Sequence, residues 1–256
     1  MGSALLSAIG KKEYAELLVF DKDIKKANEV AYRVGAHVAP VEKIAEKCDY
    51  IFLAVKPNII PSVAEEIAET VKARGSSVTV VSMAAGVDLW SLHRDFGSED
   101  VPVIRIMPNT PVSVGRGMIL WCADDNVAKN RKDEFVSLLS EAGELDSIPE
   151  RLIDAASALS GCGPAFVFMF AEALADGAVV CGLPRDKAKS YAAETLIGAA
   201  ELLKSSGRHP GELKDAVCSP GGSTIAGVMA LEDGAFRSSV MNAVISAYER
   251  TLELGK

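Results

Sequence analysis

The stretch DYIFLAV, residues 49–55, decides the fold of this chain. It is an apolar run closed by Lys56-Pro57, and a strand that is apolar at nearly every position is covered on both of its faces. Such strands are typical of a parallel sheet between two layers of helices. Further strands are predicted before and after it, at LLVFD (17–21), SVTVVSM (77–83), VIRIM (103–107), GMILWCA (117–123) and GELDSI (143–148).

Helical periodicity separates these strands in the first half of the chain. Apolar residues recur at helical spacing from Ile24 to a stop at Gly35, and again over residues 58–73. Strands that alternate with helices predict an α/β fold with a mostly parallel sheet. Past Pro149 no strand pattern recurs, and helices are predicted over residues 150–159, 164–181, 184–206, 210–217, 223–232 and 235–254. We therefore predict two domains, an α/β domain over 1–149 and an all-helical domain over 150–256.

Charge and cysteine usage exclude several classes of protein. The chain of 256 residues carries a formal net charge of −8, which argues against binding to a phosphate backbone. Five cysteines are scattered without a CxxC pair or zinc spacing, so no metal site is predicted and a reducing, cytoplasmic location is expected. The most apolar helix, residues 165–180, contains Glu172 and Asp176 and is judged too short and too charged to span a membrane.

The first residues carry half of a dinucleotide-binding signal. In a Rossmann-like fold a strand and a G-x-G-x-x-G turn open the first helix, and an acid follows about 20 residues later. Asp21 ends a strand at that distance from Gly2, so Gly2 is placed as the third glycine of the turn. The first strand and the first two glycines would then precede Met1. We therefore expect a Rossmann-like sheet that lacks its first, central strand.

Asp21 also bears on the choice of cofactor. An acid at this position accepts hydrogen bonds from the ribose of NAD and repels the 2′-phosphate of NADP. Lys22, Lys25 and Lys26 offset that repulsion and would admit NADP. Asp21 could instead cap the helix that follows it. The residues leave both NADPH and NADH open.

Five motifs in fixed order identify a family. They are AVKP (54–57), SMAAG (82–86), RIMPNTP (105–111), ALSGCGPAF (158–166) and SPGGSTI (219–225). In order and spacing they resemble pyrroline-5-carboxylate reductase, the enzyme that makes proline, and the resemblance runs along the whole chain. It implies hydride transfer from NADPH or NADH to (S)-1-pyrroline-5-carboxylate, giving L-proline. It also implies that the helical half forms a homodimer whose sites are completed by the partner chain, often within a larger homo-oligomer.

The cofactor residues follow from the strand ends and from the resemblance. AVKP follows a buried strand, so its backbone lies at the carboxyl edge of the sheet, where ligands bind in open α/β folds. Lys56 there could meet a cofactor phosphate, a ribose or the substrate carboxylate. The small residues of SMAAG would let a planar nicotinamide lie against the backbone. The predicted cofactor-binding residues are Met1, Gly2, Asp21, Lys22, Ala54, Val55, Lys56, Pro57, Ala84, Ala85, Gly86 and Asn109.

SPGGSTI predicts the substrate site. Gly221 and Gly222 are expected to leave backbone N–H groups open at a helix N-terminus, which suits a small carboxylate. Ser223 could equally be the N-cap of that helix. By resemblance, Thr224 is the catalytic residue that hydrogen-bonds the ring nitrogen of the substrate. The predicted substrate-binding residues are Lys56, Ser219, Gly221, Gly222, Ser223 and Thr224.

Two other functions remain open from the sequence. One is a two-domain dehydrogenase that acts on a hydroxy acid, although no lysine of the helical half lies in a glycine-flanked catalytic motif. The other is a dimeric scaffold that has lost its cofactor with its first strand. The partners expected are a small-molecule substrate and further copies of the chain, and neither nucleic acid nor a membrane.

Overall fold

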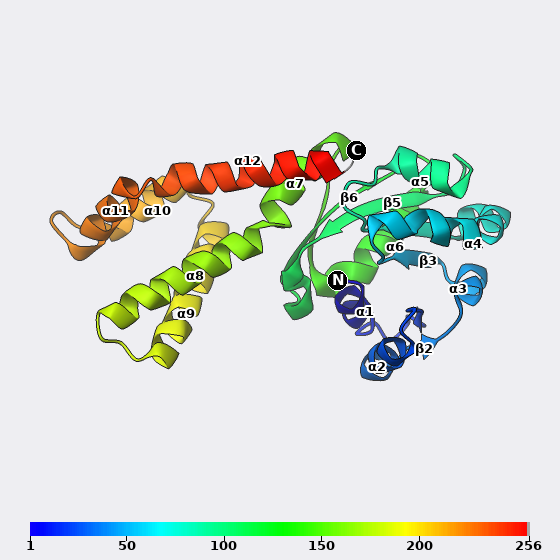
Figure 1. The fold of residues 1–256 in the computed structure, drawn as a ribbon, viewed down its shortest axis with the longest axis horizontal. Helices are drawn as coiled ribbons and strands as arrows, with labels where there is room; N and C mark the ends of the chain where they lie inside the picture. Colours follow the sequence, from blue (N-terminus) through cyan, green and yellow to red (C-terminus); the bar gives the residue numbers. More distant parts are fainter. Residues whose placement is uncertain (255–256) are drawn as a thin grey trace. The chain divides into compact units, whose positions relative to one another are not determined.

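The computed structural model describes residues 1–254 and confirms an α/β domain followed by helices (Figure 1). Its sheet is divided in two. Five strands pair in the order β3-β4-β5-β6-β7, and two short strands pair as β1-β2. All pairs are parallel except β5 with β6. The strands are β1 (Leu18–Val19), β2 (His37–Val38), β3 (Tyr50–Leu53), β4 (Thr79–Ser82), β5 (Val103–Pro108), β6 (Gly117–Ala123) and β7 (Gly143–Ser147).

Among the described residues β3 pairs only with β4, and no strand lies hydrogen-bonded between β3 and β1. This is the place that the Rossmann pattern gives to a central strand. Tyr50 and Phe52 on β3 stay partly buried because they pack against the cluster that includes Leu5 and Ile9 of the first helix, α1 (Gly2–Ile9). The core of the five-stranded sheet therefore extends to α1 and to Leu17 just before β1, although no hydrogen-bond ladder joins the two sheets.

Helices cover both faces of the five-stranded sheet. One face carries Ile51, Leu53 and Val80 and packs on α3, α4 and α5. The other face carries Val81, Ile104 and Trp121 and packs on α1 and α6. The alternation of side chains along each strand produces these two cores. The helices of this part are α1, α2 (Ile24–Val34), α3 (Val41–Lys47), α4 (Ile60–Arg74), α5 (Leu89–Phe96), α6 (Lys129–Leu139) and α7 (Glu150–Ser160).

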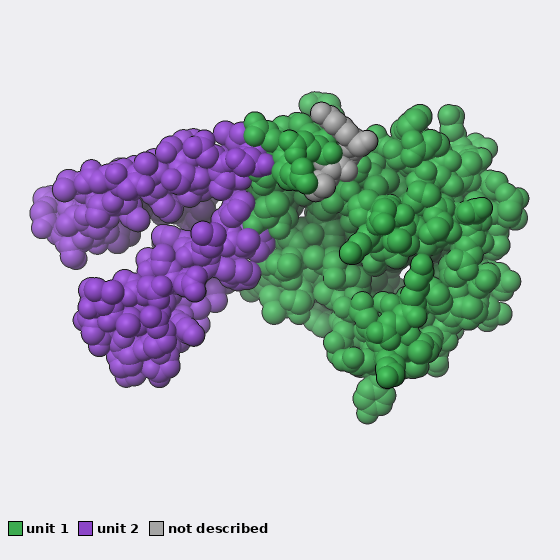
Figure 2. Space-filling model, in the orientation of Figure 1, with its two compact units in different colours: residues 1–162, 247–256 green, residues 163–246 purple. Residues whose placement is uncertain are grey.

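The chain divides into two compact units later than the sequence pattern changes. Unit 1 holds residues 1–162 and 247–256, and unit 2 holds residues 163–246 (Figure 2). This division lies beyond the predicted domain boundary at 149 because α7 packs with unit 1, and the domain boundary itself stays a prediction. Its Ile153 packs with Met107, Leu120 and Cys122 of β5 and β6. Helical character alone does not assign a segment to a helical domain.

Unit 2 consists of helices with a small core of its own. The helices that begin in it are α8 (Gly163–Val180), α9 (Arg185–Ser206), α10 (Pro210–Val217), α11 (Ser223–Asp233) and α12 (Phe236–Leu254), whose last turns belong to unit 1. Within its described residues only Ala175, Ala188 and Ala192 are buried hydrophobic side chains. Large side chains such as Phe168 and Met229 are exposed. Unit 2 alone thus leaves much apolar surface in contact with water.

One stretch of the described residues, Glu150–Val180, is long and apolar enough to cross a membrane by length and composition. This corrects the expectation that the region is too short, because α7 precedes α8 and lengthens it. A single such stretch is weak support for a membrane span, since helices that pack against protein pass the same test. Ile153 in this stretch is fully buried against the sheet.

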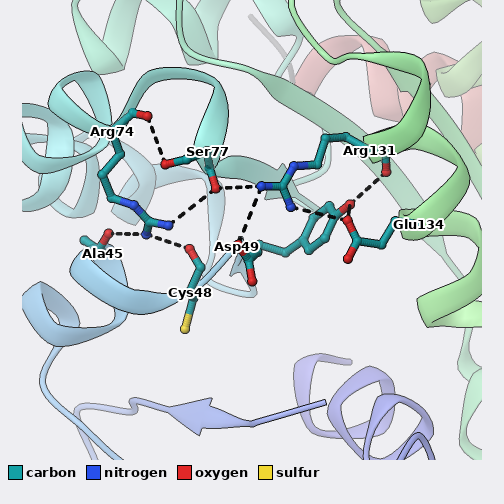
Figure 3. A network of polar contacts seen from close by, with 8 residues as sticks. Ala45, Cys48, Asp49, Arg74, Ser77, Arg131 and Glu134 are labelled. Carbon is teal, nitrogen blue, oxygen red and sulfur yellow. Dashed lines mark hydrogen bonds and ion pairs between the residues drawn. The ribbon is translucent and has the colours of Figure 1, made fainter. Parts of the chain in front are cut away.

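A polar network closes the edge of the sheet where β3 and β4 begin (Figure 3). Arg74 at the end of α4 donates from Nη1 to the carbonyls of Ala45 and Cys48, at 2.8 and 2.6 Å. Arg131 of α6 donates from Nη2 to the carbonyl of Ser77 at 2.9 Å and lies 3.5 Å from a carboxylate oxygen of Asp49. The network ties the two helical layers together at the edge opposite to the one where ligands bind in such folds.

Candidate functional site

The N-terminus of α1 lies directly against the end of β3. A Cβ atom added to Gly2 would stand 2.5 Å from the Cβ of Ala54, a distance that no real side chain tolerates. Glycine is therefore required for this close approach of helix and strand, which is the role predicted for Gly2. No side chain caps the helix, whose N-cap is Met1. The uncapped N-terminus thus offers backbone N–H groups to an anion at this point.

The predicted motif residues gather at one edge of the sheet. Strands β3, β4 and β5 are parallel, so the segments that follow them lie at the same carboxyl edge. Lys56 is exposed at this edge, and within residues 1–254 it forms no ion pair. Ala84 is buried, whereas Gly86 turns the chain with φ +74°. This edge brings together Gly2, Ala54, Val55, Lys56, Pro57, Ala84, Ala85 and Gly86.

Asp21 lies just past β1 and does not cap the helix that follows. The N-cap of α2 is Asp23, whose side chain accepts from the amides of Lys25 and Lys26. Oδ1 of Asp21 accepts from the amide of Asp23 at 3.0 Å, and Oδ2 lies 3.2 Å from Nζ of Lys26. The hydrogen bond from Asp23 and the charge of Lys26 lower the pKa of the Asp21 carboxyl. The helix-cap alternative for Asp21 is therefore wrong, and its charge is already partly balanced.

Asn109 has a structural role that its motif did not predict. Its Nδ2 donates to the carbonyl of Ser160 at 2.9 Å, and its Oδ1 accepts from the amide of Met118 at 2.9 Å. The residue is buried. Both ends of the side-chain amide thus form hydrogen bonds within the protein. The contact between Asn109 and the cofactor stays a prediction, and it would involve the backbone of Asn109.

The loop SPGGSTI forms a turn that opens α11 in unit 2. Gly221 has φ +69°, and the amide of Gly222 donates to the carbonyl of Ser219 at 3.0 Å. The amide of Gly222 is therefore not open, which corrects the prediction for that residue. The N-cap of α11 is Gly222 and no side chain caps it, so the N-cap alternative for Ser223 is wrong as well. Ser223 and Thr224 are exposed at the first turn of the helix.

Sequence reasoning missed a buried charged cluster on β5. Arg105 is only 2% exposed, yet it lies in the middle of a strand. Its Nη1 donates to Glu150 at 3.3 Å and its Nη2 to Asp154 at 2.6 Å, both on α7. The signal was present, because an arginine inside an apolar strand requires a buried partner. Residues 1–254 contain no group of His, Cys, Asp and Glu side chains that could hold a metal ion.

Burial raises the pKa of two thiols, those of Cys48 and Cys122, above the ordinary value. All five cysteines are free, and the pKa of the Cys122 thiol rises to about 12. A thiol with such a pKa is protonated and inert at neutral pH. Cys162 lies where α7 ends and α8 begins.

Comparisons with known proteins agree with these features. Residues 150–254 match the family described as pyrroline-5-carboxylate reductase dimerisation, and residues 1–86 match NADP oxidoreductase, coenzyme F420-dependent. A pyrroline-5-carboxylate reductase of Synechocystis is 38% identical over 100% of this chain and 95% of its own length. That of Escherichia coli K12 is 37% identical with the same coverage. The crystal structure of a Plasmodium falciparum pyrroline carboxylate reductase with NADP bound matches with a TM-score of 0.87 and 32% identity, over 100% of this chain and 95% of that chain.

Proposed function

The chain belongs to the pyrroline-5-carboxylate reductase family, and on that premise we propose how its residues carry out the reaction. The protein is an NAD(P)H-dependent oxidoreductase that reduces a cyclic imine, (S)-1-pyrroline-5-carboxylate, to L-proline. The observation that supports this most directly is the uncapped N-terminus of α1, pressed through Gly2 onto Ala54 at the carboxyl edge of the sheet. This is the place where a dinucleotide pyrophosphate binds in such folds.

The residues of unit 1 fit a dinucleotide. The N–H groups at the start of α1 hold the pyrophosphate, and the backbone from Ala54 to Pro57 borders it. Lys56 adds a positive charge for a phosphate, a ribose or the substrate carboxylate. Ala84, Ala85 and Gly86 leave a surface without large side chains for the nicotinamide, which supplies the hydride when the cofactor is bound. Asp21 and Lys22 lie after β1, where the ribose of the adenosine half binds.

The residues of unit 2 bind the substrate. The first turn of α11 offers the open amides of Ser223 and Thr224 to the substrate carboxylate, while Ser219, Gly221 and Gly222 hold the turn in shape. The hydroxyl of Thr224 hydrogen-bonds the ring nitrogen as donor or proton relay. A protonated imine accepts hydride readily, so the protein needs to supply chiefly position, which contributes on the order of 7–11 kcal/mol.

The role of Thr224 is tested by Thr224→Ala. We expect kcat to fall by about 100-fold, because the nitrogen loses its positioned hydroxyl, while the Kd of the cofactor stays unchanged. Thr195→Ala is the matched control, since Thr195 lies on α9 and only donates within its own helix, to the carbonyl of Tyr191. Steady-state rates and cofactor titrations measure both quantities. Unchanged turnover in Thr224→Ala would remove Thr224 from the mechanism.

A direct titration measures whether this chain binds the cofactor. NADPH and NADH are added separately to the purified protein, and binding is followed by cofactor fluorescence. We expect binding of at least one of them, followed by reduction of pyrroline-5-carboxylate and not of hydroxy acids. Absence of binding by both would favour the scaffold alternative.

We also propose that dimers assemble into a larger homo-oligomer and that the protein is cytoplasmic. The exposed apolar surface of unit 2 supports assembly through the helices, as in the family that residues 150–254 match. The cytoplasmic location is supported by the five free cysteines, which suit a reducing compartment.

A further inference from the structure

Arg105 of β5 and Asn109, which directly follows the strand, hold the two ends of α7. Arg105, Met107 and Asn109 alternate with residues of the opposite face, and the backbone of Asn109 is still extended at φ −115° and ψ 169°. Arg105 reaches the first turn of α7, and Asn109 reaches its last residue, Ser160. The helix therefore lies along the strand and is fixed by polar contacts at both ends.

The contact at the first turn joins three segments. Oε1 of Glu150 accepts from Arg105 and also from the amide of Leu89 at 2.7 Å. Leu89 opens α5, three residues after the SMAAG motif that borders the proposed nicotinamide surface. Asp154 accepts the second bond from Arg105. The buried guanidinium thus locks the SMAAG segment, β5 and α7 into one arrangement.

The contact at the last turn lies next to the boundary of unit 1. Ser160 is the last residue of α7, so its carbonyl accepts no hydrogen bond within the helix. The side-chain amide of Asn109 donates a hydrogen bond to this carbonyl. Gly161 follows in a tight position, because a Cβ there would lie 2.8 Å from the carbonyl of Ser157. Unit 1 ends at Cys162, and the chain continues into unit 2.

We propose that Asn109 and Arg105 are positioning residues for the reduction. Together they fix α7 on β5, and Glu150 of α7 in turn holds the amide of Leu89 just after SMAAG, so they set the shape of the proposed nicotinamide surface in unit 1. The proposal rests on the proposed function. Hydride transfer is sensitive to distance, and a misplacement of about 1 Å can cost about 100-fold in rate. A positioning role therefore predicts a loss of catalysis without a loss of cofactor binding.

The test uses Asn109→Asp in the full chain. Aspartate keeps the acceptor for the amide of Met118 but cannot donate to Ser160 when ionised. Its charge also faces a carbonyl at the negative end of α7, where an anion is unfavourable. Asn126→Asp is the matched control, because Nδ2 of Asn126 likewise donates to a backbone carbonyl, that of Glu99 at 2.6 Å, far from α7 in sequence. Asp154→Asn, at a partly exposed position, is a second variant that weakens the other end and keeps the fold.

We expect kcat/KM for pyrroline-5-carboxylate to fall about 10- to 100-fold in Asn109→Asp and about 3- to 10-fold in Asp154→Asn. The cofactor Kd should stay within about two-fold, and amide deuterium exchange over residues 157–163 should rise. Burial and the facing carbonyl raise the pKa of the new carboxyl above its ordinary value. The loss of kcat/KM in Asn109→Asp should therefore become smaller as the pH falls from about 8 to about 5, because the protonated carboxyl can donate to Ser160 again. Asn126→Asp should match the wild type in all of these.

Wild-type kcat/KM in both α7 variants would overturn the proposal. So would a loss of cofactor binding by the same factor as kcat/KM, since that is a general structural defect. Turnover by the wild-type chain is measured first, and its absence overturns the proposed function instead.

Discussion

Asp21 is the residue whose charge bears most directly on cofactor choice. Its carboxylate pairs with Lys26 and accepts from the amide of Asp23. In Asp21→Asn the hydrogen bond from Asp23 is kept and the charge that repels a 2′-phosphate is lost, while Lys26 becomes free to attract it. We expect the ratio of kcat/KM with NADPH to that with NADH to rise about 10-fold, equivalent to about 1.4 kcal/mol. Steady-state rates with each cofactor give the ratio.

Asp23→Asn is the control for Asp21→Asn. It removes the same charge two residues further on and keeps the N-cap of α2, because asparagine caps as well as aspartate. A local effect at the ribose predicts a much smaller shift in this control. Equal shifts in both variants would mean that only the overall charge near α2 matters.

Single residues were predictable where chemistry and spacing agree. Gly2 was placed as a packing glycine because the distance to Asp21 is that of the dinucleotide pattern, and its contact with Ala54 fits that role. Asn109 was predicted at the cofactor as a polar residue of the motif RIMPNTP, and that contact stays a prediction. The structure adds that its side-chain amide binds Ser160, which is distant in sequence. A pairing between residues far apart in the chain leaves no local trace when only one sequence is available.

Elements were predictable when their burial pattern is strong. The strands β3, β4 and β5 and the helices of unit 2 lie within a few residues of their predicted bounds. Strand β2 and helices α3, α5 and α6 were not predicted from the sequence. Helix α6 contains KNRKDEF and only its last turns are buried, at Phe135, Leu138 and Leu139, so its periodicity is weak. Strand β2 has two residues and acquires its conformation by pairing with β1.

The polar network between α4, β3 and α6 supplies a prediction on stability. Arg131 is mostly buried beside Tyr50, donates to the carbonyl of Ser77 and pairs with Asp49 and Glu134. In Arg131→Ala that carbonyl loses a charged donor, and hydrogen bonds to charged groups contribute about 1.5–3 kcal/mol. We expect a Tm about 3–10 °C lower by calorimetry, with an unchanged KM for substrate.

Arg250→Ala is the control for the network. Arg250 forms an exposed ion pair with Glu253 within α12, and such pairs contribute about 0–1 kcal/mol. Its Tm should stay close to that of the wild type. A Tm loss in Arg131→Ala no larger than in this control would show that the network closes the sheet edge without stabilising it.

At the scale of the whole molecule, the sequence predicted the change from α/β to helical structure but not where compact units divide. The pattern changes at Pro149, whereas unit 1 extends to Cys162 because Ile153 of α7 belongs to its core. Periodicity reports the type of an element, and packing decides the unit to which it belongs. The homo-oligomer is equally a property of packing, since an apolar helix face looks the same in a core and at an interface.

The exposed apolar side chains of unit 2 predict that the chain assembles into an oligomer through this unit. Phe168 of α8 is 65% exposed and Met241 of α12 is 58% exposed, while the described core of unit 2 consists of three alanines. Such exposure is typical of surfaces that a partner chain covers.

The double variant Phe168→Asp/Met241→Asp should therefore dissociate to a species of 27.0 kDa in light scattering. If the partner chain completes the substrate site, as the family resemblance implies, this variant should lose reductase activity while unit 1 still binds the cofactor. Tyr32→Asp, at a residue 93% exposed on α2 of unit 1, should keep both the assembly and the activity. A double variant that keeps the wild-type mass would place the interface on another face, and a monomer with full activity would show that each chain holds a complete site.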